Sequence, residues 1–165
     1  MVPVRIASLA VDPRSNQPVL LLKPLDEEPG FGQLLPIWIG QPEATAILLA
    51  LEGTELPRPL THDLMKSVLE TLGGHLERVE ITRVDEGTFF AVLTISAEER
   101  TLLVDARPSD SIALAIRTGA PIFVAKAVLV EAAVPDETGQ PADEEAELEA
   151  FRAFLDTVEP SDFQS

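Results

Sequence analysis

The chain has 165 residues, of which 45% are hydrophobic, a size and composition that fit one ordinary domain with a hydrophobic core and exclude wholesale disorder. Cysteine is absent, which excludes disulfides, thiolate nucleophiles and cysteine-bound metals. The formal net charge of -16 at pH 7 opposes long-range attraction to nucleic acid or to anionic membranes.

Strand patterns open the chain. Residues 4–11 and 19–25 flank a turn rich in Asp, Pro, Ser and Asn, and residues 34–39 form a third apolar run. A helix is predicted to begin after Gly40, because a proline and a glutamate follow where the first turn favours both. We expect this helix to bury four apolar residues: Ala44, Ile47, Leu48 and Leu51.

A second helix is predicted to begin at Thr61, since threonine is a good N-cap and Asp63 suits the positive first turn. Its expected buried face holds five apolar residues: Leu64, Met65, Val68, Leu69 and Leu72. Three strands are expected next, at residues 76–84, 88–96 and 100–104, the last of them buried. Short turns join these strands, which favours antiparallel pairing.

Residues 108–117 predict a third helix that ends at Gly119, and residues 121–124 predict a short strand. Residues 127–132 fit either a strand or a helix. Runs of strands with interspersed helices predict an α+β fold, with a mostly antiparallel or mixed sheet and three core helices in one domain over residues 1–134.

The remaining sequence is strongly acidic. Residues 135–143 contain turn residues without an apolar pattern, which predicts a linker or mobile loop. Residues 144–165 are expected to form an acidic amphipathic helix and tail that docks on the core or on a partner subunit, because apolar residues recur at helical spacing: Leu148, Phe151, Phe154, Leu155 and Val158. No signal peptide or bilayer-spanning run is apparent, so we expect a cytoplasmic protein without membrane attachment.

Polar side chains gather at the three predicted helix starts. The positive end of a helix favours anions, arginine binds phosphate bidentately, and carboxylates are ligands for Mg²⁺ or Mn²⁺. His62 suits acid–base catalysis because histidine titrates near neutral pH. Structural explanations stand beside these: Asp63 and Asp110 suit the helix dipole, and Asp105 can pair with Arg107.

The same three segments resemble a known family. LPIWIG at residues 35–40, RPLTHDL at residues 58–64 and DARPSDSIALA at residues 105–115 resemble, in this order, the signatures of the bifunctional nuclease domain family. The resemblance implies a compact α+β fold, a homodimer or higher homo-oligomer, and cleavage of both DNA and RNA. It also implies that the motif positions share one cleft: Glu43, Arg58, His62, Asp63, Asp105, Arg107 and Asp110.

We therefore hypothesise a nuclease that hydrolyses phosphodiester bonds of DNA and RNA. The expected catalytic residues are His62, Asp63, Asp105 and Asp110. Substrate contacts are expected from Arg58, Arg107 and Ser109, and an assisting Mg²⁺ or Mn²⁺ from Asp105, Asp110 and Glu43. The alternatives are a non-catalytic acidic oligomeric protein that regulates or binds a partner through its C-terminal helix, and a module that binds small anions at the helix starts.

Overall fold

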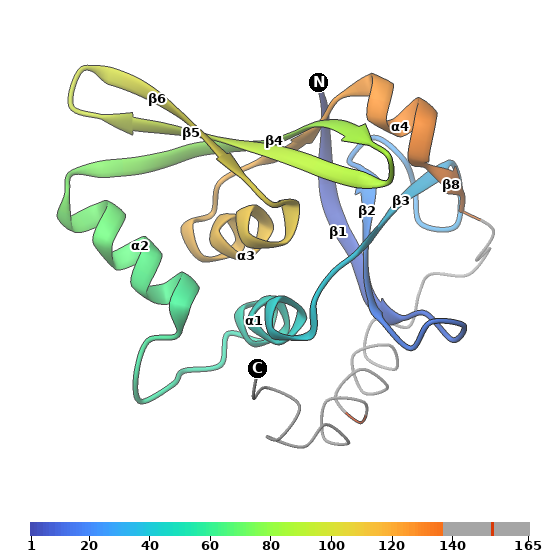
Figure 1. The fold of residues 1–165 in the computed structure, drawn as a ribbon, viewed down its shortest axis with the longest axis horizontal. Helices are drawn as coiled ribbons and strands as arrows, with labels where there is room; N and C mark the ends of the chain where they lie inside the picture. The colour runs from blue at the N-terminus through green and yellow to red at the C-terminus, as the bar shows by residue number, and fades with distance from the viewer. Residues whose placement is uncertain (137–152, 154–165) are drawn as a thin grey trace.

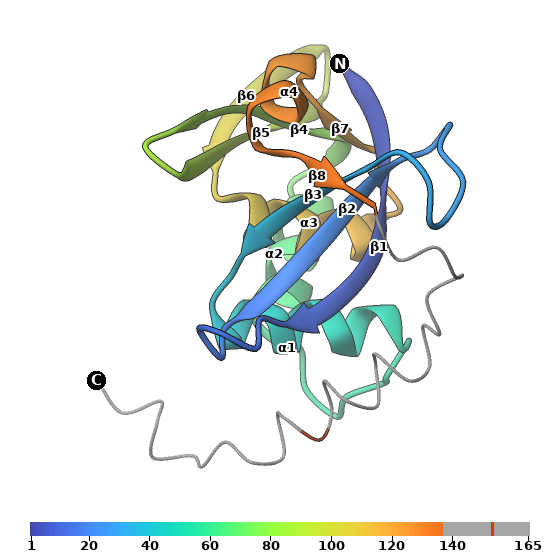
Figure 2. The same cartoon turned by 90° about the vertical axis from the view of Figure 1, so that its right-hand side faces the viewer.

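Three antiparallel strands form the first half of the sheet in this computed structural model, which describes residues 1–136 and residue 153. They are β1 (Val2–Val11), β2 (Pro18–Pro24) and β3 (Gln33–Trp38). Figure 2 shows them side by side, with α1 (Gln41–Leu51) close to their lower ends. The predicted strands in this region are confirmed.

Three further antiparallel strands form the second half: β4 (Gly74–Asp85), β5 (Thr88–Ala97) and β6 (Arg100–Ala106). The short strand β7 (Ile122–Val124) joins the halves, because it pairs antiparallel with β1 and parallel with β4. The resulting mixed sheet has eight strands in the order β6-β5-β4-β7-β1-β2-β3-β8.

Four helices accompany the sheet in the described part of the chain. Besides α1, they are α2 (Thr61–Thr71), α3 (Pro108–Thr118) and α4 (Lys126–Ala132). Figure 1 shows α1, α2 and α3 on one side of β4 and β5, with α3 in the middle and α4 on the opposite side. The α+β prediction is confirmed, and the segment that fitted either strand or helix is a helix. None of these helices is long and apolar enough to cross a membrane.

Residues 134–136, at the boundary expected between the domain and the linker, are attached to the sheet. Strand β8 (Val134–Pro135) pairs with β3, and the buried carboxylate of Asp136 lies 2.7 Å from the Lys23 Nζ. Asp136 Oδ2 also accepts a hydrogen bond from the backbone N–H of Gly30, which links this segment to the β2–β3 loop. The rest of the predicted linker and the predicted C-terminal helix lie outside the described residues, except for Ala153.

The expected buried face of α1 is confirmed for Ala44, Ile47 and Leu48, which belong to the main hydrophobic core. Leu51 is exposed, contrary to the prediction, because it is the last residue of α1. On the other side of the core, α3 buries Ile112 and its neighbours against α1 and the sheet, and Gly119 ends α3 in a left-handed conformation, as predicted.

The predicted burial of α2 is largely wrong. Leu64 is 54% exposed and Leu72 is 76% exposed, and Met65 and Val68 are also exposed; Leu69 alone of the predicted face packs on the core. Its main contacts in the described part of the chain are with α3 and β4, and they leave most of its apolar side chains exposed.

The predicted cap of α2 is also wrong. Thr61 is the first helical residue, and Leu60 is the extended residue before it. Asp63 takes over the capping role, because its Oδ2 accepts a hydrogen bond from the Leu60 backbone N–H at 2.9 Å.

Candidate functional site

The starts of α1, α2 and α3 converge on one pocket of about 330 Å³. Each helix is preceded by one residue with an extended backbone: Gly40 before α1, Leu60 before α2 and Arg107 before α3. Both polar and apolar residues line this pocket: Pro42, Glu43, Thr45, Ala46, Leu60, Thr61, His62, Arg107 and Asp110. The fold thus assembles residues that lie more than sixty positions apart in the chain.

Four of these side chains form a connected series, which we call the Arg107 cluster: Glu43, Arg107, Asp110 and His62. Arg107 Nη2 donates to Glu43 Oε1 at 2.8 Å, and Arg107 Nε donates to Asp110 Oδ2 at 2.8 Å. The other oxygen of Asp110 lies 3.0 Å from His62 Nε2. Arg107 is 66% exposed and His62 is buried, so the cluster runs from the surface into the protein.

The cluster favours charged carboxylates. Burial opposes ionisation of Asp110, but hydrogen bonds from Arg107 and His62 outweigh it and lower the pKa of this carboxyl below its usual value. The hydrogen bonds to Asp110 and Glu43 in turn raise the pKa of Arg107. Because an ionised carboxylate can only accept, His62 Nε2 is the donor to Asp110 in the neutral ring.

That assignment leaves His62 Nδ1 as a lone-pair acceptor. Nδ1 is shielded from solvent and has no hydrogen-bond partner among residues 1–136 and 153, and the same holds for Gln41 Nε2. These are the two buried side-chain polar atoms without a partner in the described residues, and both belong to residues at helix starts around the pocket. Such atoms are rare in folded proteins, which makes this region chemically unusual.

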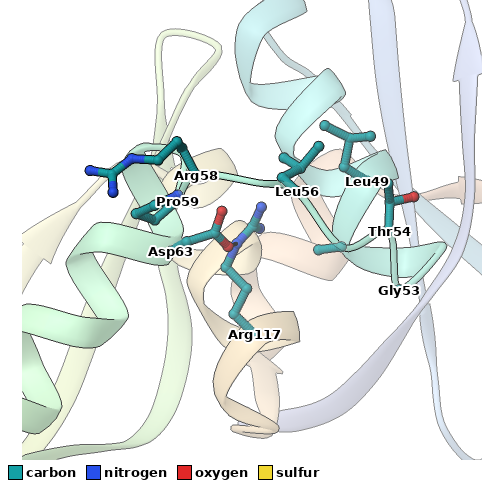
Figure 3. Close-up of a pocket in the computed structure, with 9 residues that line it drawn as sticks. Leu49, Gly53, Thr54, Leu56, Arg58, Pro59, Asp63 and Arg117 are labelled. Carbon is teal, nitrogen blue, oxygen red and sulfur yellow. Dashed lines mark hydrogen bonds and ion pairs between the residues drawn. The ribbon is translucent and has the colours of Figure 1, made fainter.

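Asp63 faces a second pocket, of about 480 Å³, between α1, α2 and the loop that joins them (Figure 3). Its Oδ1 accepts from Arg117 Nε at 2.5 Å, and Arg117 also donates to the carbonyls of Ala113 and Ala46. Burial opposes ionisation of Asp63, but Arg117 and the Leu60 N–H lower its pKa overall. These contacts tie α1, α2 and α3 together.

Arg58 lines this second pocket, but its guanidinium points away from the Asp63–Arg117 pair (Figure 3). It is exposed and makes no ion pair with any described residue. Arg58 is therefore a cation available to an anionic ligand.

Two further predicted site residues lie outside both the Arg107 cluster and the second pocket. Asp105 is exposed on β6, and Ser109 is buried in the first turn of α3; neither lines the two pockets just described. Strand β6 itself is exposed rather than buried as predicted, because it is the edge of the sheet and no described helix covers it.

The positions of these residues show whether the described side chains could hold a metal ion. Among residues 1–136 and 153, no three His, Asp or Glu side chains are arranged to hold a metal. The Arg107 guanidinium lies between Glu43 and Asp110, where a bound cation would have to compete with it. The described side chains thus do not form a ready metal site, and dependence on Mg²⁺ or Mn²⁺ stays a prediction.

Arg117 is the site residue that sequence reasoning did not propose. A basic residue in the last turn of a helix is common, because it interacts favourably with the helix dipole. Its contact with Asp63, 54 positions away, depends on the packing of α2 against α3. The sequence contains no signal for that packing.

Known proteins match the chain over most of its length. The sequence profile described as the bifunctional nuclease domain matches residues 22–137, which include all three helix starts. An uncharacterized protein of Mycobacterium tuberculosis is 47% identical over 167 residues, covering 98% of each chain. Bifunctional nuclease 1 of Oryza sativa is 33% identical and covers 61% of this chain and 31% of the plant protein. Bifunctional nuclease 1 of Arabidopsis thaliana is 30% identical and covers 66% and 34%, respectively.

Proposed function

The chain belongs to the bifunctional nuclease domain family, and from this premise we propose that it hydrolyses phosphodiester bonds of DNA and RNA at the Arg107 cluster. The observation that carries the proposal is the convergence of an exposed arginine and a His–Asp pair in one pocket. Both belong to segments that the family profile covers.

Arg107 is the proposed phosphate ligand. It is the most exposed member of the cluster and uses two of its five N–H donors on Glu43 and Asp110, so the other N–H groups can donate to a phosphate. Arg58 can supply a second cation at the neighbouring pocket.

Proton transfer is assigned to the carboxylate of Asp110. Hydrolysis needs a base that takes a proton from the attacking water and an acid that returns one to the leaving oxygen. Asp110 lines the pocket, and hydrogen bonds from Arg107 and His62 lower the pKa of its carboxyl, so it is ionised at neutral pH and can take the proton from the attacking water. The Asp110 carboxyl, then protonated, returns this proton to the leaving oxygen. His62 acts as a positioning residue, since its Nε2–H holds one oxygen of Asp110 and its Nδ1 is shielded from solvent.

The test is cleavage of single-stranded DNA and RNA by stringently purified protein, in EDTA and in Mg²⁺ or Mn²⁺. We expect Asp110→Asn to lower the rate by about 10²-fold or more, the usual range for loss of a general base. His62→Gln, which retains a side-chain N–H donor, is expected to lose less activity than His62→Ala.

Arg83→Gln is the matched control, because it removes an exposed cation on β4 whose described contact is the ring of Phe90. Equal cleavage by wild type and Asp110→Asn would contradict the assignment and indicate a contaminant or another site. Activity that appears only with a metal and is lost in Asp105→Ala would return Asp105 to the site and overturn the roles given above.

A second candidate function is a non-catalytic oligomeric protein that binds partners. The exposed apolar residues of α2 and β6 favour it, because monomeric proteins rarely expose such surfaces without a use. Absence of cleavage by wild-type protein under all three conditions would favour this function over hydrolysis.

A further inference from the structure

The second pocket adjoins the pocket of the Arg107 cluster, which we call the first pocket. Pro59 lines the second pocket, and its neighbour in the chain, Leu60, lines the first. In the first turn of α2 the same division recurs, because His62 lines the first pocket and Asp63 lines the second. The start of α2 is thus the boundary between two neighbouring pockets.

Helix α1 lines both pockets along one face. Six of its residues take part, in this order along the helix: Pro42, Glu43, Thr45 and Ala46 in the first pocket, then Leu49 and Ala50 in the second. Residues three and four positions apart lie on the same face of a helix, so these residues form a continuous stripe. From one pocket to the next the stripe advances by about six residues, roughly 9 Å along the helix axis.

Helix α3 packs beside this stripe. Arg107 and Asp110, at its start, belong to the first pocket, and Arg117, in its last turn, belongs to the second. Arg117 also donates to the backbone carbonyl of Ala46, which lines the first pocket. The two pockets are therefore successive recesses along α1 and α3, and we call them together the α1–α3 groove.

Each pocket of the groove has one exposed arginine. Arg107, in the first pocket, keeps N–H groups that its two carboxylate partners do not use. Arg58, in the second pocket, makes no ion pair with any described residue. The carboxylates that line the two pockets are already paired with arginines, and Glu52 and Glu55 of the α1–α2 loop line neither pocket. A chain of phosphates can thus contact a cation in each pocket.

Exposed apolar side chains accompany the two arginines. Leu56 and Pro59 line the second pocket beside Arg58 (Figure 3), and Leu60 lines the first. Leu56 and Leu60 are exposed although both are apolar. Bases can pack on such side chains only where they are not paired and stacked within a duplex. The groove therefore suits a strand whose bases are unpaired.

We propose that the substrate is a single strand of nucleic acid that lies along the α1–α3 groove, with the phosphate to be hydrolysed at Arg107 and another phosphate at Arg58. This inference rests on the proposed function and adds to it the substrate class and a second binding subsite. The offset of roughly 9 Å between the pockets spans two or three nucleotides at the 3.4 Å spacing of a stacked strand. A dinucleotide has one bridging phosphate and cannot reach both arginines.

The second subsite is tested by comparing a single strand of about ten nucleotides with a dinucleotide as substrates. We expect Arg58→Gln to raise KM for the longer strand about ten-fold or more and to leave kcat nearly unchanged, because a charge-assisted contact to a remote phosphate is lost. For the dinucleotide neither constant should change. Arg58→Lys retains the charge and should retain most of the affinity. Arg83→Gln, which removes an exposed cation of β4 outside both pockets, is the matched control.

Binding is measured separately, because it does not require hydrolysis. A phosphorothioate strand of the same length resists cleavage, and fluorescence anisotropy at several salt concentrations gives its dissociation constant. Loss of one phosphate contact in Arg58→Gln should reduce the slope of the logarithm of affinity against the logarithm of salt concentration by about 0.7, whereas Arg83→Gln should leave it unchanged. A duplex of the same length should bind more weakly than the single strand, because its bases cannot contact the apolar side chains.

The outcomes separate this inference from the proposed hydrolysis. Equal binding of the strand by wild type and Arg58→Gln would overturn the inference, as would an equal change of KM for the dinucleotide or tighter binding of the duplex. Wild-type protein that binds the strand through Arg58 but cleaves no substrate would support the groove and contradict the hydrolysis. Cleavage that depends on Asp110 but not on Arg58 would support the hydrolysis and contradict the groove.

Discussion

Two helices with similar amphipathic patterns have different surroundings in this protein. Leu48 of α1 is buried against α3 and the sheet, whereas Leu64 of α2 is more than half exposed. Both leucines follow the same helical spacing and both were expected in the core. A periodic pattern identifies which face of a helix is apolar, but the surface that covers this face can come from the same chain or from another one.

The largest expected effect on stability is at Asp136, whose carboxylate forms an ion pair with the buried Lys23 side chain. Among the described residues, Asp136→Ala leaves Lys23 Nζ the Phe31 carbonyl and, 3.9 Å away, Glu27, and it should lower the free energy of unfolding by about 3–5 kcal/mol. Urea denaturation measures the change. Asp26→Ala, in the exposed turn after β2, should have almost none; an equal loss in both would show that Lys23 does not depend on Asp136.

The next prediction compares the same leucine-to-alanine substitution in α1 and in α2. Leu48→Ala should cost about 3 kcal/mol of unfolding free energy, because it opens a cavity in the core. Leu64→Ala should cost about 0.5 kcal/mol or less. Both are measured by urea denaturation at the same protein concentration. Similar costs for the two substitutions would show that α2 is covered within the monomer.

The smallest effect concerns acid stability at α2. The pKa of Asp63 is lowered in the folded protein, so the folded state binds fewer protons than the unfolded state. Its stabilising contribution is complete above the ordinary aspartate value of about 3.9 and is lost as the pH falls through the lowered pKa.

Asp63→Asn should therefore destabilise the protein near neutral pH but not at a pH below the lowered pKa. Urea midpoints at about pH 7 and at successively lower pH values measure this difference. Asp26→Asn is the control, as an exposed aspartate without an ion pair in the described residues. An Asp63→Asn deficit that persists unchanged at low pH would show that its role is not electrostatic.

Part of the candidate site could be predicted from sequence and part could not. Helix starts after Gly40, near Thr61 and before Pro108 have local signals in proline, acidic residues and glycine, and these signals located Glu43, His62 and Asp110. The division of the predicted residues between two pockets was not predictable. Asp63 and His62 are adjacent in sequence, but one contacts Arg117 and the other contacts Asp110.

The sequence by itself determined the α+β class, most of the strands and helices, and the segments that carry the site, because propensity, capping and hydrophobic period act over a few residues. The tertiary structure decided that Arg107 bridges Glu43 and Asp110, that Lys23 is buried against Asp136, and that α2 and β6 keep apolar faces uncovered. These outcomes depend on which elements meet across many tens of residues. A pattern within a few residues does not predict which distant elements will contact one another.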